Sequence, residues 1–238
     1  KGTKRKRILG WREIMSKKIL IAPSILAGDF AAMGKSVAAL SIWGADMVHC
    51  DVMDGVYVPN ITFGMPMIKA IRKHTTLPLD VHLMIVEPEK YIQEFIDAGA
   101  DRICFHPETC KDPIAQLNGI KAKGVKAGIA INADVLCEPY LDLLKHCDFI
   151  MLMSVQAGYG GQSFIPKTLE KIKVVDAFIK ENNLDVDIEI DGGINENNVQ
   201  SVIDAGVSII VAGSSVYKSL NPPSTIEKLR GSKARQVA

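Results

Sequence analysis

The chain has 238 residues, 47% of them hydrophobic, which is enough apolar side chain for one well-buried domain. No run of about 18 apolar residues occurs, which excludes a transmembrane helix. Its five cysteines are odd in number and show no CxxC spacing, so the sequence favours a reducing cytoplasmic setting over a disulfide framework.

The net charge of +1 hides an uneven distribution of charged residues. Residues 1–18 hold eight Lys or Arg and one Glu, which leaves a net charge of −6 on the remainder. An acidic body does not indicate nucleic-acid binding. The basic run at residues 4–7 fits either a localisation or polyanion patch or an unstructured extension upstream of Met15. We favour the second interpretation and expect residues 1–18 to be a disordered extension.

Apolar, β-branched segments alternate with longer helical patterns over residues 19–230. Strands are expected at residues 19–23, 46–52, 79–84, 102–106, 126–131, 148–153, 186–191 and 208–212. Helices are expected at residues 30–42, 64–73, 88–98, 112–123, 135–145, 166–182, 195–205, 214–219 and near 224–230. Prolines stand at several expected helix starts and glycines just past several helix ends, where each residue is tolerated best.

Eight strands that alternate with helices imply parallel strands joined by right-handed crossovers. The pattern predicts a single (β/α)8 TIM barrel at residues 19–230, followed by a tail at 231–238. An open doubly wound sheet is the alternative. The barrel is favoured because polar residues follow several non-adjacent strands, and barrel active sites are built at those strand ends.

Polar side chains on three of the expected strands indicate a metal site. His49 and Asp51 alternate along the second strand and therefore face the same side, His82 lies on the third, and Asp191 ends the seventh. A borderline divalent ion accepts imidazole nitrogen and carboxylate oxygen together. Ordinary core residues are the competing interpretation. The metal site is favoured because buried carboxylates need partners.

Glycine-rich turns follow the sixth, seventh and eighth expected strands, at Gly158-Tyr159-Gly160-Gly161, Gly192-Gly193 and Gly213-Ser214. Exposed backbone N–H groups in such turns bind anions without a basic side chain. One such turn only shows that the chain bends tightly, whereas three on consecutive strand ends indicate a phosphate site. No GxxxxGK[ST] or strand-linked GxGxxG motif occurs, so a small phosphorylated metabolite is favoured over a nucleotide.

Other side chains at strand ends have two open interpretations. Met53, Met84 and Met153 fall on the face that lines the barrel, where they either fill the core or form an apolar cap over a reaction cavity. Ser24 follows the first strand and is a candidate hydrogen-bond donor to substrate or an ordinary loop serine.

Four further polar residues near strand ends have no assigned role. His106 and Glu108, after the fourth strand, fit a role in the site and a supporting role equally well. Asp54 and Asp80 are interpreted as structural or supporting acids.

Six segments, in chain order from about Ile19 to Ser219, resemble the ribulose-phosphate 3-epimerase family. They are His49-Cys50-Asp51-Val52-Met53-Asp54-Gly55, Val58-Pro59-Asn60-Ile61-Thr62-Phe63-Gly64, Asp80-Val81-His82-Leu83-Met84, Gly158-Tyr159-Gly160-Gly161-Gln162, Asp191-Gly192-Gly193-Ile194 and Val211-Ala212-Gly213-Ser214. The first two together are highly specific. The resemblance implies a ribulose-phosphate-binding (β/α)8 barrel that interconverts D-ribulose 5-phosphate and D-xylulose 5-phosphate, an isomerase of the pentose phosphate pathway.

The resemblance also implies roles for individual residues. It implies one divalent metal ion, zinc or iron(II) with manganese or cobalt as alternatives, bound by His49, Asp51, His82 and Asp191. It makes Asp51 and Asp191 the acid/base pair that exchanges the C3 proton through an enediolate. It places Ser24, His82 and Asp191 at the substrate. The phosphate would be surrounded by Gly158, Tyr159, Gly160, Gly161, Gly192, Gly193, Gly213 and Ser214.

One segment departs from the family pattern. Gln156-Ala157 stand where the family usually has an acidic residue or Asn followed by Pro, which predicts a looser loop and bears on substrate preference. The alternatives are an epimerase of a six-carbon ketose phosphate such as allulose 6-phosphate, an aldolase-type lyase on the same fold, and a non-catalytic sugar-phosphate sensor. We expect a cytoplasmic homo-oligomer that binds a small phosphorylated ketose, with no nucleic-acid or membrane partner.

Overall fold

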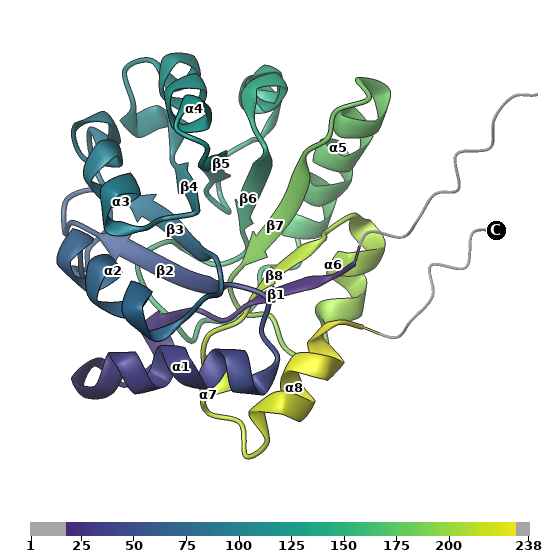
Figure 1. The fold of residues 1–238 in the computed structure, drawn as a ribbon. Helices are drawn as coiled ribbons and strands as arrows, with labels where there is room; N and C mark the ends of the chain where they lie inside the picture. Colours follow the sequence, from purple (N-terminus) through teal and green to yellow (C-terminus); the bar gives the residue numbers. More distant parts are fainter. Residues whose placement is uncertain (1–17, 232–238) are drawn as a thin grey trace, which may run out of the picture.

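The structure, a computed structural model, describes residues 18–231 and contains one eight-stranded parallel sheet (Figure 1). The strands are β1 (Leu20–Ala22), β2 (Val48–Met53), β3 (Leu79–Met84), β4 (Arg102–Phe105), β5 (Lys126–Ile131), β6 (Phe149–Met153), β7 (Asp187–Asp191) and β8 (Ile209–Val211). Their order in the sheet is β1-β8-β7-β6-β5-β4-β3-β2. All eight strands were predicted, and their ends differ from the predicted ones by at most two residues.

Contacts between β1 and β2 close the sheet into a barrel. Ser24 and His49 form an isolated parallel bridge, and the His49 N–H donates to the carbonyl of Pro23 at 3.0 Å. The Asp46 N–H donates to the Ile21 carbonyl at 2.9 Å. A doubly wound sheet would leave these two edges unpaired, so the TIM-barrel prediction is confirmed.

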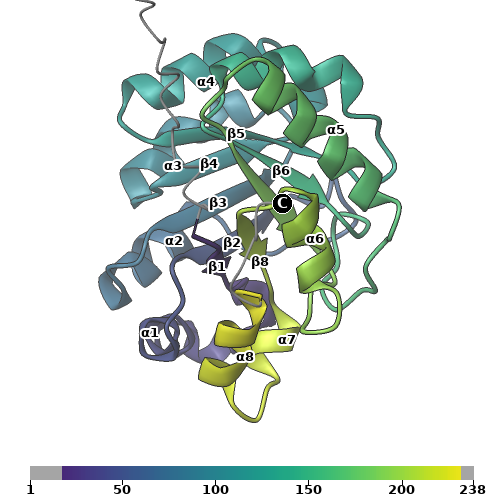
Figure 2. The same cartoon turned by 90° about the vertical axis from the view of Figure 1, so that its right-hand side faces the viewer.

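The helices lie outside the strands (Figures 1 and 2). The α-helices are α1 (Met33–Trp43), α2 (Met65–Ile71), α3 (Ile92–Ala98), α4 (Pro113–Ala122), α5 (Thr168–Glu181), α6 (Val199–Ala205), α7 (Ser214–Tyr217) and α8 (Pro222–Leu229). The 3-10 helices are η1 (Ile25–Ala27), η2 (Phe30–Ala32), η3 (Arg72–His74), η4 (Pro88–Lys90), η5 (Pro107–Thr109) and η6 (Glu138–His146). Among these described helices, none is long and apolar enough to cross a membrane.

The connection between β5 and β6 differs from the expected helix at 135–145. It is the 3-10 helix η6, which begins at Glu138 and has Pro139 in its first turn. The N–H of Tyr140 donates to the carbonyl of Cys137, three residues back, as a 3-10 helix requires. The expected helices at 30–42 and 88–98 likewise begin with 3-10 turns, η2 and η4, before α1 and α3.

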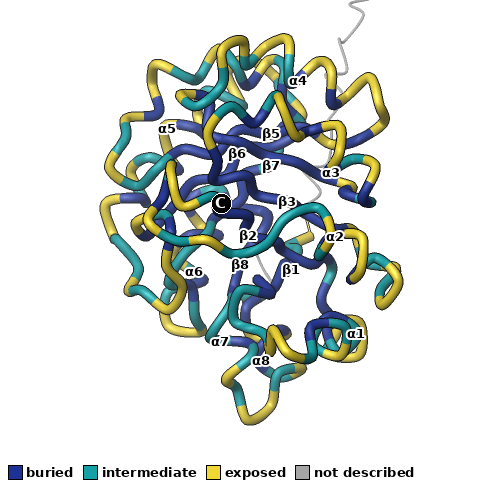
Figure 3. The backbone as a smooth tube through the Cα atoms, turned by 90° about the vertical axis from the view of Figure 1, so that its left-hand side faces the viewer, coloured by how far each residue is buried: buried dark blue, intermediate teal, exposed yellow. Residues whose placement is uncertain are grey.

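Burial on both faces of the strands explains their nearly continuous apolar sequence (Figure 3). One face packs against the helices, with Val48, Val81 and Ile150 among the residues of that layer. The other face fills the barrel with a smaller cluster that includes Phe149 and Met151. The barrel interior therefore has a dry, packed layer beneath its carboxyl end, and polar groups there must satisfy one another.

The ends of the described chain meet beside β1. Lys18, which was expected to be part of the N-terminal extension, forms an ion pair with Asp46 at 2.8 Å. Arg230, just after α8, contacts the same carboxylate at 2.6 Å and donates to the Ile19 carbonyl. The rest of the expected extension, residues 1–17, and residues 232–238 of the expected tail lie outside the described residues.

Candidate metal centre and active site

The barrel brings the four predicted metal ligands together at the carboxyl ends of β2, β3 and β7. One ligand atom from each of His49, Asp51, His82 and Asp191 lies within 4.8 Å of the others. Asp51 stands between the two imidazoles, with its Oδ1 3.3 Å from His49 Nε2 and 3.4 Å from His82 Nδ1. The parallel register explains part of this geometry, because Asp51 on β2 is the direct partner of His82 on β3.

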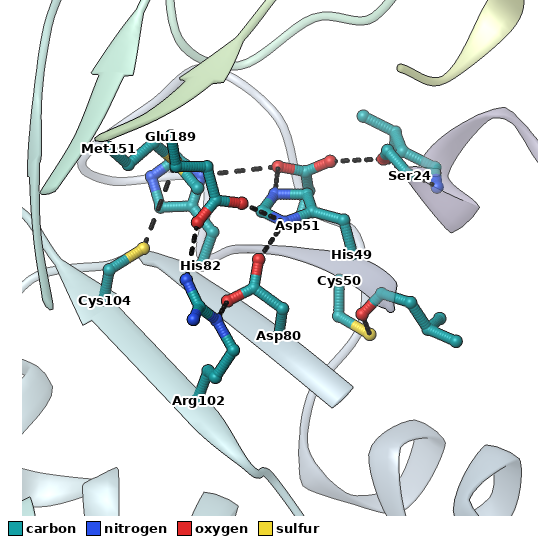
Figure 4. A network of polar contacts seen from close by, with 12 residues as sticks. Ser24, His49, Cys50, Asp51, Asp80, His82, Arg102, Cys104, Met151 and Glu189 are labelled. Atoms are coloured by element: carbon teal, nitrogen blue, oxygen red, sulfur yellow. Dashed lines mark hydrogen bonds and ion pairs between the residues drawn. The ribbon is translucent and has the colours of Figure 1, made fainter. Parts of the chain in front are cut away.

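The free ring nitrogens of the two histidines fit a bound cation. His49 Nε2 and His82 Nδ1 are buried, and neither forms a hydrogen bond within residues 18–231. The opposite nitrogen of each ring is held, His49 Nδ1 by Asp80 at 2.8 Å (Figure 4) and His82 Nε2 by His106 at 3.0 Å. Buried polar atoms without partners are costly. A set of two nitrogens and two carboxylates suits a borderline divalent ion.

The two carboxyl groups of this set differ in acidity. Burial opposes ionisation of Asp51, but the adjacent imidazoles of His49 and His82 outweigh it and hold the pKa of Asp51 below its ordinary value. Burial and the negative charge of Asp51 raise the pKa of Asp191 to about 7. Two such carboxylates repel each other when both ionise. A divalent cation between them would remove that repulsion.

Beneath the ligand set lies a buried ion network of Asp80, Arg102 and Glu189 (Figure 4). Arg102 Nε donates to Asp80 and its Nη2 donates to Glu189, both at 3.0 Å, while its guanidinium lies 3.9 Å from the ring centre of Phe149. Burial and the charge of Asp80 raise the pKa of Glu189. Burial also opposes ionisation of Asp80, but Arg102 and His49 help to outweigh it and lower the pKa of Asp80. The network therefore fixes the ring of His49 through Asp80.

Sequence reasoning assigned no role to Arg102 or Glu189. Strand alternation could have predicted that Glu189 faces the barrel interior, because it precedes Asp191 by two residues and shares its face. A role for Arg102 can be assigned only from the pairing of β3 with β4, in which it is the direct partner of Asp80. A basic residue at the start of a strand otherwise indicates solvent exposure.

A cavity of about 900 Å³ opens at the carboxyl end of the barrel. His49 and His82 do not line it, because both rings are fully buried beneath Asp51. Ser24 lies beside the acid, and its hydroxyl donates to Asp51 Oδ2 at 2.6 Å. The predicted residues that line the cavity are Ser24, Asp51, Met53, Met84, Met153, Gly158, Tyr159, Gly160, Gly161, Asp191, Gly192, Gly193, Gly213 and Ser214.

The three methionines form part of the apolar wall of this cavity. Met53 and Met84 pack with Val58 in one small cluster, and Met153 belongs to the cluster that fills the barrel. All three methionines are buried. Their thioether side chains therefore present an apolar surface to the same space that the two acids face.

The turns after β7 and β8 contribute Gly192, Gly193 and Gly213 to the cavity lining. The N–H groups of Gly192, Gly193 and Gly213 have no backbone acceptor in the described part of the chain. Gly193 adopts a φ of 67°, and a Cβ there would lie 2.4 Å from the backbone nitrogen of Phe164. Only glycine fits such a position. Lys218, which sequence reasoning missed, is the one Lys or Arg among the described residues of the cavity lining.

The loop between β6 and α5 is held by side chains despite the missing proline. Gln162 Nε2 donates to the carbonyls of Gln156 at 2.7 Å and Tyr159 at 2.8 Å. Asn60 Nδ2, from the loop after β2, donates to the Gly158 carbonyl at 2.9 Å. The Gln162 bonds connect the loop to itself, and the Asn60 bond joins it to the loop after β2.

A closed parallel barrel with these side chains at its carboxyl end is a TIM-barrel protein whose polar site lies where enzymes of this fold place their chemistry. Solved structures agree on the fold alone. A tryptophan synthase α-subunit from Pyrococcus furiosus superposes with a TM-score of 0.65 at 15% identity, covering 91% of this chain and 99% of that one. An orotidine 5'-phosphate decarboxylase from Pyrococcus horikoshii gives 0.65 at 13% identity, covering 89% and 97%.

Residues 20–217 match the ribulose-phosphate 3 epimerase family, and the chain belongs to that family of isomerases. Ribulose-phosphate 3-epimerase from Synechocystis is 47% identical over 221 residues, which cover 92% of this chain and 96% of the relative. The proteins of the same name from Bacillus subtilis and Escherichia coli are 44% and 42% identical, covering 90% and 92% of this chain and 100% and 98% of their own lengths. The predicted family and enzyme class are confirmed.

Proposed function

We propose that this protein interconverts D-ribulose 5-phosphate and D-xylulose 5-phosphate by exchanging the proton on C3. The proposal depends on one observation. Two carboxyl groups of different acidity, Asp51 on β2 and Asp191 on β7, line one cavity, and next to them are two imidazole nitrogens without a hydrogen bond to any described residue. The names of the relatives give the substrate class. A carbon acid beside a ketone needs both charge stabilisation and proton transfer, and this site offers groups for each.

His49, Asp51, His82 and Asp191 would hold one divalent cation, zinc or iron(II). When bound, this cation would act as a Lewis acid toward the negative charge that develops on the sugar oxygens. Asp80 and His106 hold the rings of the two histidines from behind. Such support from outside the ligand set orients the ligands and fixes which nitrogen bears the proton.

Asp51 and Asp191 would move the proton. Inversion at C3 removes a proton from one face of an enediolate and returns a proton to the other, so it needs one acid/base group on each face. With one carboxyl group ionised and the other protonated, one is ready to accept and the other to donate, and the reverse reaction exchanges their roles. Ser24 donates to Asp51 and would orient that carboxylate.

The remaining cavity residues would bind and enclose the substrate. The turns at residues 158–161, 192–193 and 213–214 present glycine backbone to the cavity, and Lys218 adds a positive charge to its wall. Binding a phosphate remote from C3 supplies positioning energy for the reacting carbon. Met53, Met84 and Met153 would exclude water from the enediolate and limit its side reactions.

The test is deuterium incorporation at C3 of ribulose 5-phosphate in heavy water. We expect exchange by wild-type protein loaded with zinc or iron(II), and a loss of epimerisation to xylulose 5-phosphate of about 10²–10⁴-fold in D51N and D191N. D142N is the matched control, because Asp142 is 84% exposed and lies outside the cavity. Near-wild-type epimerisation by D191N would contradict the two-base scheme, and full exchange by verified metal-free protein would contradict the metal. Faster turnover of a six-carbon ketose phosphate would reassign the substrate.

A further inference from the structure

His106 is a fully buried histidine that belongs to neither the ligand set nor the cavity lining. It follows β4 directly, and its ring lies between those of His82 and Tyr57, with ring centres 5.1 Å and 4.8 Å away. Its Nε2 is 3.0 Å from His82 Nε2. Its Nδ1 faces Glu108 Oε1 at 3.7 Å and makes no hydrogen bond within the described residues.

When both rings are neutral, the protons of His82 and His106 can be arranged in only two ways. Two imidazole nitrogens 3.0 Å apart share one proton, so one ring donates and the other accepts. If His82 donates from Nε2, its Nδ1 is bare and can bind a cation, and the proton of His106 must be on Nδ1. If His106 donates instead, the proton of His82 is on Nδ1, which blocks the nitrogen that faces the cation site.

Glu108 distinguishes these two arrangements. An ionised carboxylate only accepts hydrogen bonds, so it stabilises a proton on His106 Nδ1 and repels a bare lone pair there. Glu108 is itself fixed, because the Tyr57 hydroxyl donates to its Oε1 at 2.6 Å and Asn132 Nδ2 donates to that hydroxyl at 2.6 Å. Each donor in this chain points toward the carboxylate. Asp51 Oδ1, 3.4 Å from His82 Nδ1, competes for a proton on that nitrogen, whereas Glu108 favours the opposite arrangement, in which His82 donates to His106 and His106 Nδ1 faces Glu108.

We propose that Glu108, acting through His106, is a positioning residue that keeps Nδ1 of His82 free to bind a divalent cation. This inference rests on the metal site of the proposed function and adds a requirement to it. Asp80 fixes the ring of His49 by direct contact, whereas the carboxylate that serves His82 acts through a second imidazole. The two histidine ligands are thus oriented in different ways, one by a carboxylate directly and one by a carboxylate through a second imidazole.

Glu108→Gln is the informative substitution. Its amide nitrogen can donate to His106 Nδ1, so the variant favours the arrangement in which the proton of His82 is on Nδ1. Loss of such outer support typically costs 10–100-fold in metal affinity. Glu196→Gln is the matched control, because Glu196 is an exposed carboxylate that forms an ion pair with Lys228 and takes no part in the contacts that link His82 to Glu108.

The experiment measures the dissociation constant of Zn²⁺ by competition with a chelator, without substrate or turnover. We expect E108Q to bind Zn²⁺ about 10–100-fold more weakly than wild type, and E196Q to bind within twofold of wild type. The visible spectrum of the Co²⁺ form should change in E108Q alone. Equal affinities for E108Q and E196Q would overturn the inference and leave the proposed function standing. A wild-type protein that binds no Zn²⁺ would overturn the inference and the proposed metal site together.

A second measurement needs no variant. Nitrogen-15 NMR of the Zn²⁺-loaded wild-type protein, in which the ion and not a proton would face Asp51, reports which nitrogen of each histidine bears a proton. We expect the proton of His82 on Nε2 and that of His106 on Nδ1. A proton of His106 on Nε2, or Zn²⁺ bound to Nε2 of His82, would refute the role of Glu108 even if E108Q did not fold.

Discussion

Replacing Asp191 by Asn should stabilise the metal-free protein at alkaline pH while it removes activity. The pKa of Asp191 is raised from 3.8 to about 7 by burial and by the charge of Asp51. At about 1.36 kcal/mol per pKa unit, this shift is worth about 4 kcal/mol as an upper limit. Asp191 lines an open cavity, where solvent screening reduces the value, so we expect a gain of about 1–3 kcal/mol.

The sign of the effect depends on pH. A carboxyl group whose pKa is raised on folding contributes its stability below the unfolded pKa and loses it as the pH rises through the folded pKa. Wild type and D191N should therefore unfold alike near pH 4. The free energy of unfolding of D191N should exceed that of wild type increasingly as the pH rises to about 7, and the gap should then level off.

Urea unfolding followed by circular dichroism, with a chelator present, measures this gap at a series of pH values. D142N controls for the loss of an exposed carboxylate. With Zn²⁺ in place of the chelator the order should reverse, because wild type gains binding free energy from four ligands and D191N from three. A gap that does not change with pH, or a D191N protein less stable than wild type at about pH 8, would refute the reasoning.

Three further predictions concern single side chains. Ser24→Ala removes a donor from an ionised carboxylate, so turnover should fall about 10-fold or more with unchanged Zn²⁺ affinity; an unchanged kcat would contradict a role in orienting Asp51. Lys218→Ala should raise KM about 10-fold at constant kcat, if its charge attracts the phosphate; a changed kcat alone would assign it elsewhere. Arg102→Leu leaves the buried carboxylates of Asp80 and Glu189 without their cation, so the free energy of unfolding should fall by about 3–5 kcal/mol in thermal and urea unfolding. An unchanged free energy of unfolding would show that both acids take up protons at little cost.

Local patterns were sufficient for the strands and for the candidate ligands. A period of two along β2 places His49 and Asp51 on one face, and that relation holds in any sheet. The same patterns misjudged residues 138–146, because a segment with Pro139 in its first turn can form 3-10 instead of α-helical hydrogen bonds while its apolar spacing stays the same.

The sequence by itself therefore determined the eight parallel strands, the family, and the identities of the acids and imidazoles at the strand ends, since each depends on local periodicity or on short motifs. Only the tertiary structure decided which of these groups touch. The register of β2 with β3 sets Asp80 beside His49, and that of β3 with β4 sets Arg102 beside Asp80. Closure of β1 onto β2 brings Ser24 to Asp51. Glu108 follows His106 by two residues, but the contacts of His106 with His82 and of Glu108 with Tyr57 depend on packing across several strands, and no local pattern encodes the distance between residues that the chain separates.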